Sequence, residues 1–485
     1  MSISASLNNA LSGLTANARA AELVSNNVAN ATNPSYARRE LVLGARVVGD
    51  TGQGVNVLGV DRIVDRALLS DRRTADASAA GRSLRVSFFA GLEAVVGSNS
   101  EAGSLTGRIA TFESTLIEAA SRPDSEARLA NVAASLRQVA SAFSQASGAV
   151  QESRMRADRT IATQVKTLND ALARVQDMNV LIRAARTSGN DASGLMDQRQ
   201  QAVDLVATIV PIRELQRDHD QIALVTAGGA TLLDGKASVF GFAAVNIITP
   251  DMTLASGALS GLTLNGNPIA IGVPPGIVDG GTLAAHFDVR DRLAVDAQGS
   301  LDAVARNLVA RFQDPALDAT RAPGAAGLLT DAGGAFVAPN EVGLSARLAI
   351  NAQVDPSQGG ALWRLRDGLG ATVQGPPGNG ALLSQLQGAM TQSQPTVSGP
   401  FSSGARSFAV LTGELSSLVA SSRINAETDL SFARARADSL QELHLAQGVD
   451  TDQEMQKLLV IEQAYSANAK VVQTMDELIQ ILMRL

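Results

Sequence analysis

The sequence predicts a mainly helical, elongated protein of several domains, with β-rich insertions. Of its 485 residues 45% are hydrophobic but only 3% are aromatic, a composition typical of long packed helices rather than of an aromatic-rich enzyme core. Apolar residues recur every three or four positions at both ends of the chain, which is the pattern of coiled-coil helices. A third such repeat covers residues 124–185 and predicts a rod.

The N-terminal helix is predicted from an unbroken 4-3 spacing that contains one asparagine. Its stripe consists of Ile3, Leu7, Ala10, Leu14, Asn17, Ala21, Val24 and Val28. We expect the helix to end before Pro34, because the residue before a proline is disfavoured in the helical region. After it, Gly52, Gly54 and Gly59 alternate with valines and predict a short hairpin.

The long repeat over 124–185 predicts either one continuous helix or two helices of a rod. A single helix here would be about 90 Å long at 1.5 Å per residue. Gly148 is the one glycine within it, and a lone glycine costs a helix about 1 kcal/mol. Further helices are predicted at 301–312, at 408–418 and again through 428–446.

Two segments between the helices have a different character. From about residue 214 to 280, β-forming residues cluster between glycines and Asp-Gly turns, which predicts strands and hairpins. Residues 314–400 hold many prolines and glycines, as in "QGPPGNGA". That composition predicts a loop-rich module inserted into the helical rod.

The C-terminal helix is predicted to begin with a capping box formed by Thr451 and Glu454. Its stripe then consists of Leu458, Ile461, Tyr465, Asn468, Val472, Met475, Ile479 and Leu482. Taken singly, each terminal stripe could belong to an ordinary amphipathic helix of a globular core. Their presence at both termini favours a paired coiled coil, in which we expect Asn17 and Asn468 to share one bundle. The two tyrosines of the chain, Tyr36 and Tyr465, lie near opposite ends and suggest that those ends meet.

The sequence points away from catalysis and from nucleic acid. The formal charge of −7 and the scattered Lys and Arg do not suit phosphate binding. Without cysteine there are no disulfides, thiolate metal sites or cysteine nucleophiles. Three distant histidines and the lack of a phosphate-loop motif predict no metal, no cofactor and no enzyme. The acid pairs Asp452/Glu454 and Asp476/Glu477 are expected on solvated helix faces.

The sequence predicts neither a cleaved secretory signal nor a membrane-spanning segment. The N-terminus has no compact apolar segment and its first basic residue is Arg19, so it does not resemble a cleaved secretory signal. No stretch approaches the roughly 18 apolar residues of a membrane span. The sequence therefore predicts a soluble protein that, if exported, uses a route without a cleaved signal.

The segment "SNNVANATNPSYARRE" (25–40) resembles the N-terminal signature of bacterial flagellar axial proteins, where a helix end leads into a Thr-Pro-Gly-Tyr turn. The matching residues are Asn26, Asn27, Ala29, Asn30, Pro34 and Tyr36. Ser35 stands where the superfamily has Gly, and Asn33 where it has Thr. The serine affects only the turn type, because glycine adopts positive φ freely and serine does not.

The C-terminal segment from Gly448 onward is similar to the end of the hook-associated protein 1 family, the first of the two hook–filament junction proteins. The matching residues are Gly448, Val449, Asp450, Asp452, Glu454, Gln463, Ala464, Tyr465, Thr474, Asp476, Glu477 and Leu478. Two internal segments, "LMDQRQQAVDLV" (195–206) and "GGTLAAHFDVRDRL" (280–293), also resemble this family. Residues 314–400 show no such likeness.

The resemblance implies a domain organisation. An inner-core coiled-coil domain would combine 1–35 with 448–485, and a helical rod domain would combine 36–213 with 281–313 and 401–447. The β-rich module would be 214–280, and the loop-rich outer module 314–400. The assembly and partner residues would be Ile3, Leu7, Leu14, Ala21, Asn27, Val28, Asn30, Pro34, Tyr36, Leu458, Ile461, Tyr465, Asn468, Val472, Met475, Ile479 and Leu482.

The resemblance further implies a structural adaptor at the distal end of the extracellular hook, exported through the flagellar type III channel. Its partners would be the hook protein, the second junction protein, an export chaperone at the C-terminal helix, and itself in a ring of about eleven copies. Terminal stripes that lack a partner would stay disordered until assembly. A hook or distal-rod protein, expected to contain more β-structure, is the nearest alternative. A secreted coiled-coil adhesin, or an enzyme with a site in 214–400, is a more remote one.

Overall fold

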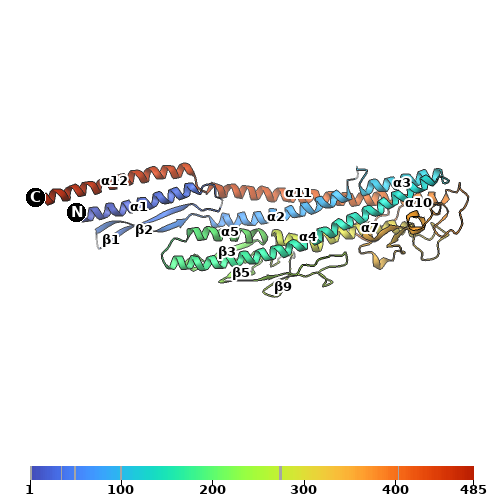
Figure 1. Ribbon diagram of the computed structural model, residues 1–485, viewed down its shortest axis with the longest axis horizontal. Helices are drawn as coiled ribbons and strands as arrows, with labels where there is room; N and C mark the ends of the chain where they lie inside the picture. The colour runs from blue at the N-terminus through green and yellow to red at the C-terminus, as the bar shows by residue number, and fades with distance from the viewer. Residues whose placement is uncertain are drawn as a thin grey trace.

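The computed structural model is an elongated molecule with both ends of the chain at the same end (Figure 1). It describes residues 3–33, 35–48, 51–98, 101–271, 276–401 and 403–484. Helices predominate, and the strands form small antiparallel sheets, so the predicted mainly helical fold with β-rich insertions is confirmed. Within these ranges no helix has both the length and the apolar character needed to cross a membrane.

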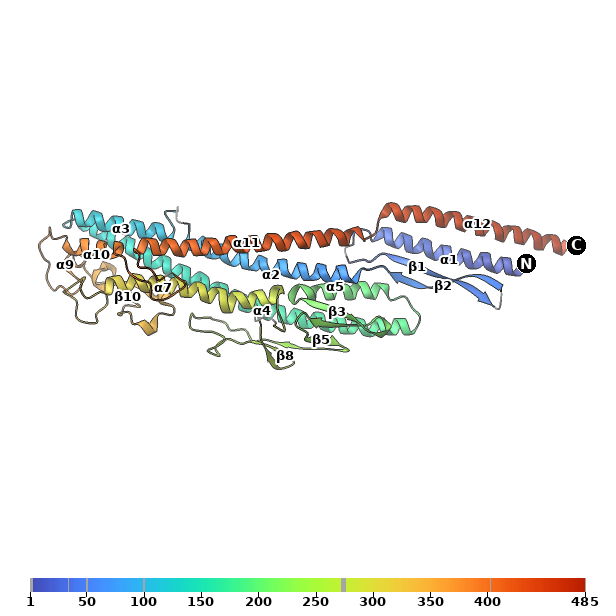
Figure 2. The ribbon, with the colours of Figure 1, turned by 180° about the vertical axis from the view of Figure 1, so that it is seen from behind.

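The terminal unit consists of two helices and a hairpin: α1 (Ile3–Ala29), β1 (Arg39–Val48), β2 (Thr51–Arg62) and α12 (Thr451–Arg484). The two helices lie side by side, as the sequence predicts, and they run antiparallel (Figures 1 and 2). The predicted hairpin is also present.

The hairpin packs along α1 rather than belonging to the helical rod, where the range 36–213 would place it. The physical reason is a close backbone contact. The amide of Val55 donates a hydrogen bond to Ser12 Oγ at 3.1 Å. Gly54, with φ +94°, lies so near that a Cβ atom would come within 2.1 Å of the same oxygen, and only glycine fits there.

The rod is built around three long helices, α2, α4 and α11, with shorter helices packed against them (Figure 1). Its elements are α2 (Arg66–Val96), α3 (Leu105–Ser121), α4 (Glu126–Thr187), α5 (Ser193–Ile209), α6 (Gly281–Asp288), the π-helical turn η2 (Val289–Leu293), α7 (Ala294–Gln313) and α11 (Phe408–Ala446). The predicted long helix is one continuous element, α4, of 62 residues and about 93 Å. The sequence predicts separate helices at 408–418 and 428–446, but the structure has one continuous helix, α11, over both ranges.

The β-rich module lies along one side of the rod, against α4 and α5 (Figure 2). A four-stranded antiparallel sheet holds β3 (Ile212–Gln216), β4 (Ile222–Thr226), β5 (Thr231–Asp234) and β6 (Lys236–Ala237), and a three-stranded one holds β7 (Phe240–Gly241), β8 (Leu262–Leu264) and β9 (Asn267–Ile269). Asn179 of α4 is polar within an apolar stripe because its amide donates to the Ile222 carbonyl at 2.8 Å.

The loop-rich module, 314–400, lies at the end of the rod opposite the chain termini (Figure 2). Its elements are β10 (Leu329–Asp331), α8 (Leu344–Arg347), β11 (Leu348–Ile350), α9 (Arg364–Asp367) and α10 (Ala381–Thr391). It buries several leucines against α3, α4 and α7, so it closes that end of the rod.

Buried arginines attach both modules to the rod. Arg154 and Arg290, each at most 1% exposed, reach from α4 and η2 to carbonyls of the 242–260 segment. Arg290 Nη1 also donates to Asp158 Oδ1 at 2.7 Å, and its guanidinium stacks on Phe287. Arg311 of α7 donates to the carbonyls of Ala389, Gln392 and Arg406 at 2.6–2.9 Å. Irregular segments expose carbonyls, and a planar five-donor group satisfies several at once.

Candidate assembly site

Asn27, from the signature in the last turns of α1, connects the two ends of the chain. Its Nδ2 donates to Glu454 Oε2 at 2.8 Å and to the Arg39 carbonyl at 2.9 Å. Its Oδ1 accepts from the Arg39 amide at 3.0 Å and from the Tyr36 hydroxyl at 2.8 Å. The side chain is 1% exposed, and every donor and acceptor of its amide has a hydrogen-bond partner. Neither Asp nor Leu could replace it.

Glu454 is the single buried residue of α12, whose residues the structure describes throughout. Its second oxygen, Oε1, accepts from Lys457 Nζ at 2.8 Å and lies 3.9 Å from Arg38 Nη1. The predicted capping box is therefore wrong. Asp450 caps the helix instead, accepting from the amides of Asp452 and Gln453. The expectation that Glu454 is solvated is also wrong, because the Asn27 contact takes it into the interior.

Tyr36 and Arg39 extend this contact toward the rod. Burial raises the pKa of the Tyr36 phenol above its ordinary value, and the Arg39 guanidinium lies 4.7 Å from the centre of the Tyr36 ring. Arg39 Nη2 then donates to Asp197 Oδ2 at 2.8 Å, and Arg62 Nε donates to Asp197 Oδ1 at 2.7 Å. These contacts, which we call the joint, link both strands of the hairpin to α5.

Asp197 and its neighbour Arg199 belong to the internal segment 195–206 that resembles the flagellar family. Arg199 holds α5 in place, because its Nη1 donates to Asn179 Oδ1 at 2.8 Å and to the Asp220 carbonyl at 2.6 Å. Burial lowers the pKa of Arg199 to about 10. This segment therefore supplies the rod side of the joint. Only the resemblance drew attention to it, since nothing in its spacing shows what Asp197 meets.

The structure places the predicted assembly residues in several environments. Partly buried are Ile3, Leu7, Leu14, Ala21, Val28, Asn30, Leu458, Ile461, Asn468, Val472, Met475 and Ile479. Tyr465 and Leu482 are exposed, and Pro34 lies outside the described residues. Tyr36 is at the joint and Tyr465 is not, so the ends meet through Asn27 and Glu454 instead of through the two tyrosines.

Asn468 lies opposite Gly13 of α1. A Cβ atom on Gly13 would come within 2.8 Å of Asn468 Nδ2, which donates to the Ala464 carbonyl of its own helix. Asn17 lies one turn further along α1. The two asparagines thus belong to the same helix pair, although Asn468 faces a glycine.

A second apolar stripe of α12 stays largely exposed to solvent. This flank consists of Val460, Val471, Leu478 and Leu482, which are 39–64% exposed. Val460 also borders a groove of about 620 Å³ between α12, α1 and β1, with Leu23, Val24 and Leu43 on its other walls. The sequence patterns name two of its residues, Leu482 in the predicted stripe and Leu478 in the resemblance, but they do not predict the flank as a surface, although its spacing of 11, 7 and 4 residues is visible in the sequence.

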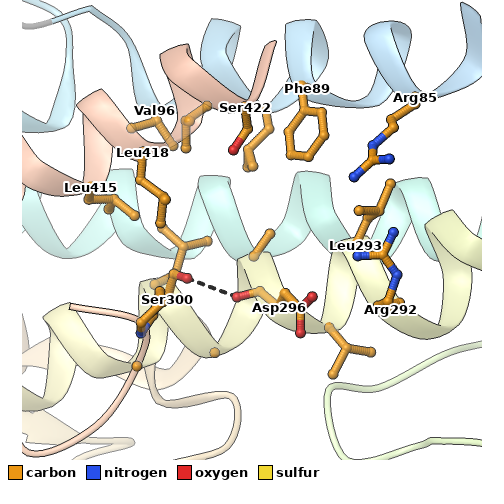
Figure 3. A pocket seen from close by; sticks show the side chains of 18 residues that line it. Arg85, Phe89, Val96, Arg292, Leu293, Asp296, Ser300, Leu415, Leu418 and Ser422 are labelled. Carbon is orange, nitrogen blue, oxygen red and sulfur yellow. Dashed lines mark hydrogen bonds between the residues drawn. The ribbon is translucent and has the colours of Figure 1, made fainter. Parts of the chain in front are cut away.

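The rod holds a separate hollow of about 520 Å³ between α2, α7 and α11 (Figure 3). Phe89, Leu415 and Leu418 are among its walls, and Arg85 and Arg292 lie together at one side. The Ser300 hydroxyl donates to the Asp296 carbonyl at 2.9 Å. Across the described ranges, no three His, Cys, Asp or Glu side chains are grouped so as to hold a metal ion.

Two parts of the chain match models of known protein families. Residues 89–327 match the model of the flagellar hook-associated protein FlgK helical domain, and residues 446–485 match that of the flagellar basal body rod FlgEFG protein C-terminal region. These ranges cover most of the rod with the β-rich module, and the whole of α12.

Curated relatives carry the name flagellar hook-associated protein 1. The one from Salmonella typhimurium is 25% identical over 285 residues, 54% of this chain and 51% of its own length. The chain thus spans about half of that relative. The one from Bacillus subtilis is 22% identical over 512 residues, 98% of this chain and 96% of its own length.

Among solved structures, the flagellar hook junction protein FlgK from Burkholderia pseudomallei is 16% identical, with a TM-score of 0.44 over 54% of this chain and 46% of that chain. The two domain matches, one in the rod and one at the C-terminus, and the shared name of the relatives lead to one conclusion. Over the matched parts of the rod and over α12, the chain is similar to proteins named flagellar hook-associated protein 1.

Proposed function

We propose that the chain is a structural adaptor of the bacterial flagellum, which assembles at the distal end of the hook and joins it to the filament through the second junction protein. The observation that carries this proposal is the exposed apolar flank of α12, whose Val460 borders a groove lined by both apolar and charged residues. An exposed apolar stripe of this kind marks a protein interaction surface. The names of the relatives supply the hook as its place.

The proposed partners follow from this similarity. They are the hook protein, the second junction protein, further copies of this chain in a ring of about eleven, and an export chaperone at α12. We place the assembled protein outside the cell, exported without a cleaved signal. The similar proteins are named flagellar hook-associated proteins, and we propose no catalytic activity.

The terminal unit is the proposed assembly domain, formed by 1–35 with 448–485, and the hairpin belongs with it. The stripes predicted from the sequence pack on each other, so their partner is already present within one chain. What awaits other subunits is the flank. We therefore expect protease to cut α12 slowly in the free protein and more slowly still after assembly.

The test is binding to isolated hooks, imaged at their distal ends. The full chain should form a ring there, and a chain without 1–35 and 448–485 should not. Two point variants give a more specific test than the truncation. Val471→Glu puts a charge on the flank, and Gln473→Glu puts one on the opposite exposed face of the same helix. We expect only Val471→Glu to lose binding.

Other outcomes separate the alternatives. Failure of the full chain to bind hooks would contradict the adaptor role and favour a hook or distal-rod protein. Equal binding by the truncated chain would assign binding to the rod or its modules. Equal binding by both point variants would show that the flank is not the contact surface.

A further inference from the structure

The apolar stripes of α12 do not by themselves determine how this helix packs on α1. The stripe that faces α1 includes Leu458, Ile461, Val472, Met475 and Ile479, and the flank lies about 100° around the helix. Both are rows of aliphatic side chains, so burying either one would gain a similar free energy. A 3-4 repeat also matches itself after a shift along the axis.

Two contacts select one rotation and one axial position of α12 on α1, and both select the same alignment. Glu454 meets Asn27 near one end of the pair, and Asn468 meets Gly13 fourteen residues further along each helix. Equal steps in opposite directions are what a single antiparallel register requires. A side chain at Gly13 would collide with Asn468, so the helices approach closely here only in this alignment.

The Asn27–Glu454 contact is the more discriminating of the two because both side chains are 1% exposed. If α12 rotated to present its flank, or slid by one turn, Asn27 would lose its acceptor and the Glu454 carboxylate its buried donor. Leaving a buried group without its partner costs about 1–3 kcal/mol, and more for a charged one. Alternative packings of the apolar stripes offer no comparable gain.

We propose that Asn27 and Glu454 are positioning residues that fix the register and the rotation of α12 on α1. They thereby keep Val460, Val471, Leu478 and Leu482 on the outside. A buried polar pair can specify register at some cost in stability. The register itself is a property of the free chain, whereas its use in presenting the flank rests on the proposed function.

The test uses the absence of cysteine from the chain, because two introduced cysteines are then the sole labelling sites. Spin labels at Glu22→Cys on α1 and Glu462→Cys on α12 occupy exposed positions. Pulsed electron paramagnetic resonance measures the distance between them. We expect one narrow distance in the parent chain and an additional, different distance in Glu454→Leu, in which α12 shifts by one helical turn, about 5 Å along α1.

Two variants separate register from stability. Glu454→Gln keeps an acceptor for Asn27 and should retain the parent distance, as should Glu477→Leu, an exposed acid on the same helix. The double variant Asn27→Leu, Glu454→Leu removes the buried amide and the buried carboxylate together, at the cost of the contacts of Asn27 with Tyr36 and the Arg39 backbone. It should stay helical by circular dichroism and still show the displaced distance.

A single parent-like distance in both Leu variants would overturn the proposal, and so would a broad distribution in the parent chain. These outcomes are independent of hook binding. A chain with a fixed register that fails to bind hooks would contradict the proposed function alone.

Discussion

The rod and the terminal unit are both built from amphipathic helices, yet they bury them very differently. Helix α4 buries a long, mostly apolar row that contributes to two large cores and is interrupted by Arg154, Asp158 and Asn179. In α1 and α12, both described in full, the buried apolar residues are Ala10, Ala16 and Val24. The rod therefore buries its main apolar rows within one chain, although α11 leaves Ile424 and Phe432 exposed. The terminal unit buries far less and leaves apolar surface available for partners.

The polar contacts differ in the same way. In the rod, buried arginines hold irregular segments onto helices that a core already stabilises. In the terminal unit, Asn27 and Glu454 join two helices that have little core of their own. The comparison suggests that hydrophobic burial gives the rod its stability, while polar contacts give the terminal unit its alignment.

The largest effect is expected where a charge is buried in the rod. Arg290→Ala would leave Asp158, 1% exposed, without its guanidinium partner, and should lower the free energy of unfolding by about 3–5 kcal/mol. Arg292→Ala is the matched control, since its ion pair with Asp288 is exposed and worth about 0–1 kcal/mol. Chemical denaturation followed by circular dichroism measures both, and similar losses would contradict the prediction.

The same substitution in both regions compares them directly. Ile161 is fully buried in the rod, so Ile161→Ala should cost about 2–5 kcal/mol. Ile461 is partly exposed in α12, so Ile461→Ala should cost about 1 kcal/mol or less. Denaturation combined with hydrogen exchange in each region provides the measurement. Equal losses would mean that the terminal unit has a closed core.

A smaller effect is expected where the two regions meet. Asp197→Asn removes the charge that Arg39 and Arg62 share, at a cost of about 1–3 kcal/mol. We expect trypsin to cut faster after Arg38 and Arg39 in this variant, because the joint opens more often. Asp177→Asn, on the exposed side of α4, should leave the cutting rate unchanged. If Asp197→Asn does the same, the joint depends on other contacts.

The smallest effect concerns pH. Burial, with Arg72 nearby, lowers the pKa of His444 below its ordinary value near 6.5. The unfolded chain therefore takes up a proton first as the pH falls, so this contribution to stability is present above pH 6.5 and declines below it. His444→Gln should reduce this loss of stability at low pH, as measured by hydrogen exchange around the joint. His219→Gln, on the exposed surface of the β-rich module, should leave it unchanged. A decline unchanged in His444→Gln would assign it to another group.

Much of the fold could be predicted because it depends on local periodicity. The 3-4 repeat over 124–185 predicts one long helix or two helices of a rod, and the structure has one, α4. The Gly-Val alternation predicts the hairpin that β1 and β2 form. The misassignments have physical causes. The predicted domain bounds place the hairpin in the rod. The contact that holds it on α1 joins Val55 to Ser12, 43 positions apart, and no local pattern in the sequence shows it. The capping box failed because Glu454 has a distant partner that outweighs a local one.

The candidate site was only partly predictable. The resemblance singled out Asn27, Tyr36 and the segment containing Asp197, but not what they contact. Asn27 and Glu454 are 427 positions apart, and Arg62 and Asp197 are 135 apart. No spacing rule relates residues so distant, because such pairs exist only once the helices have packed.

The sequence by itself determined that the chain is rich in long helices, that both ends carry coiled-coil stripes, and that β-rich and loop-rich modules interrupt the rod. These features follow from which residues share one face of a helix or strand. The tertiary structure alone decided which face of α12 meets α1, which side remains uncovered, and that Asp197 joins the terminal unit to the rod. Those outcomes depend on the few polar groups that must find partners when apolar surfaces pack, since apolar contact is nearly indifferent to register.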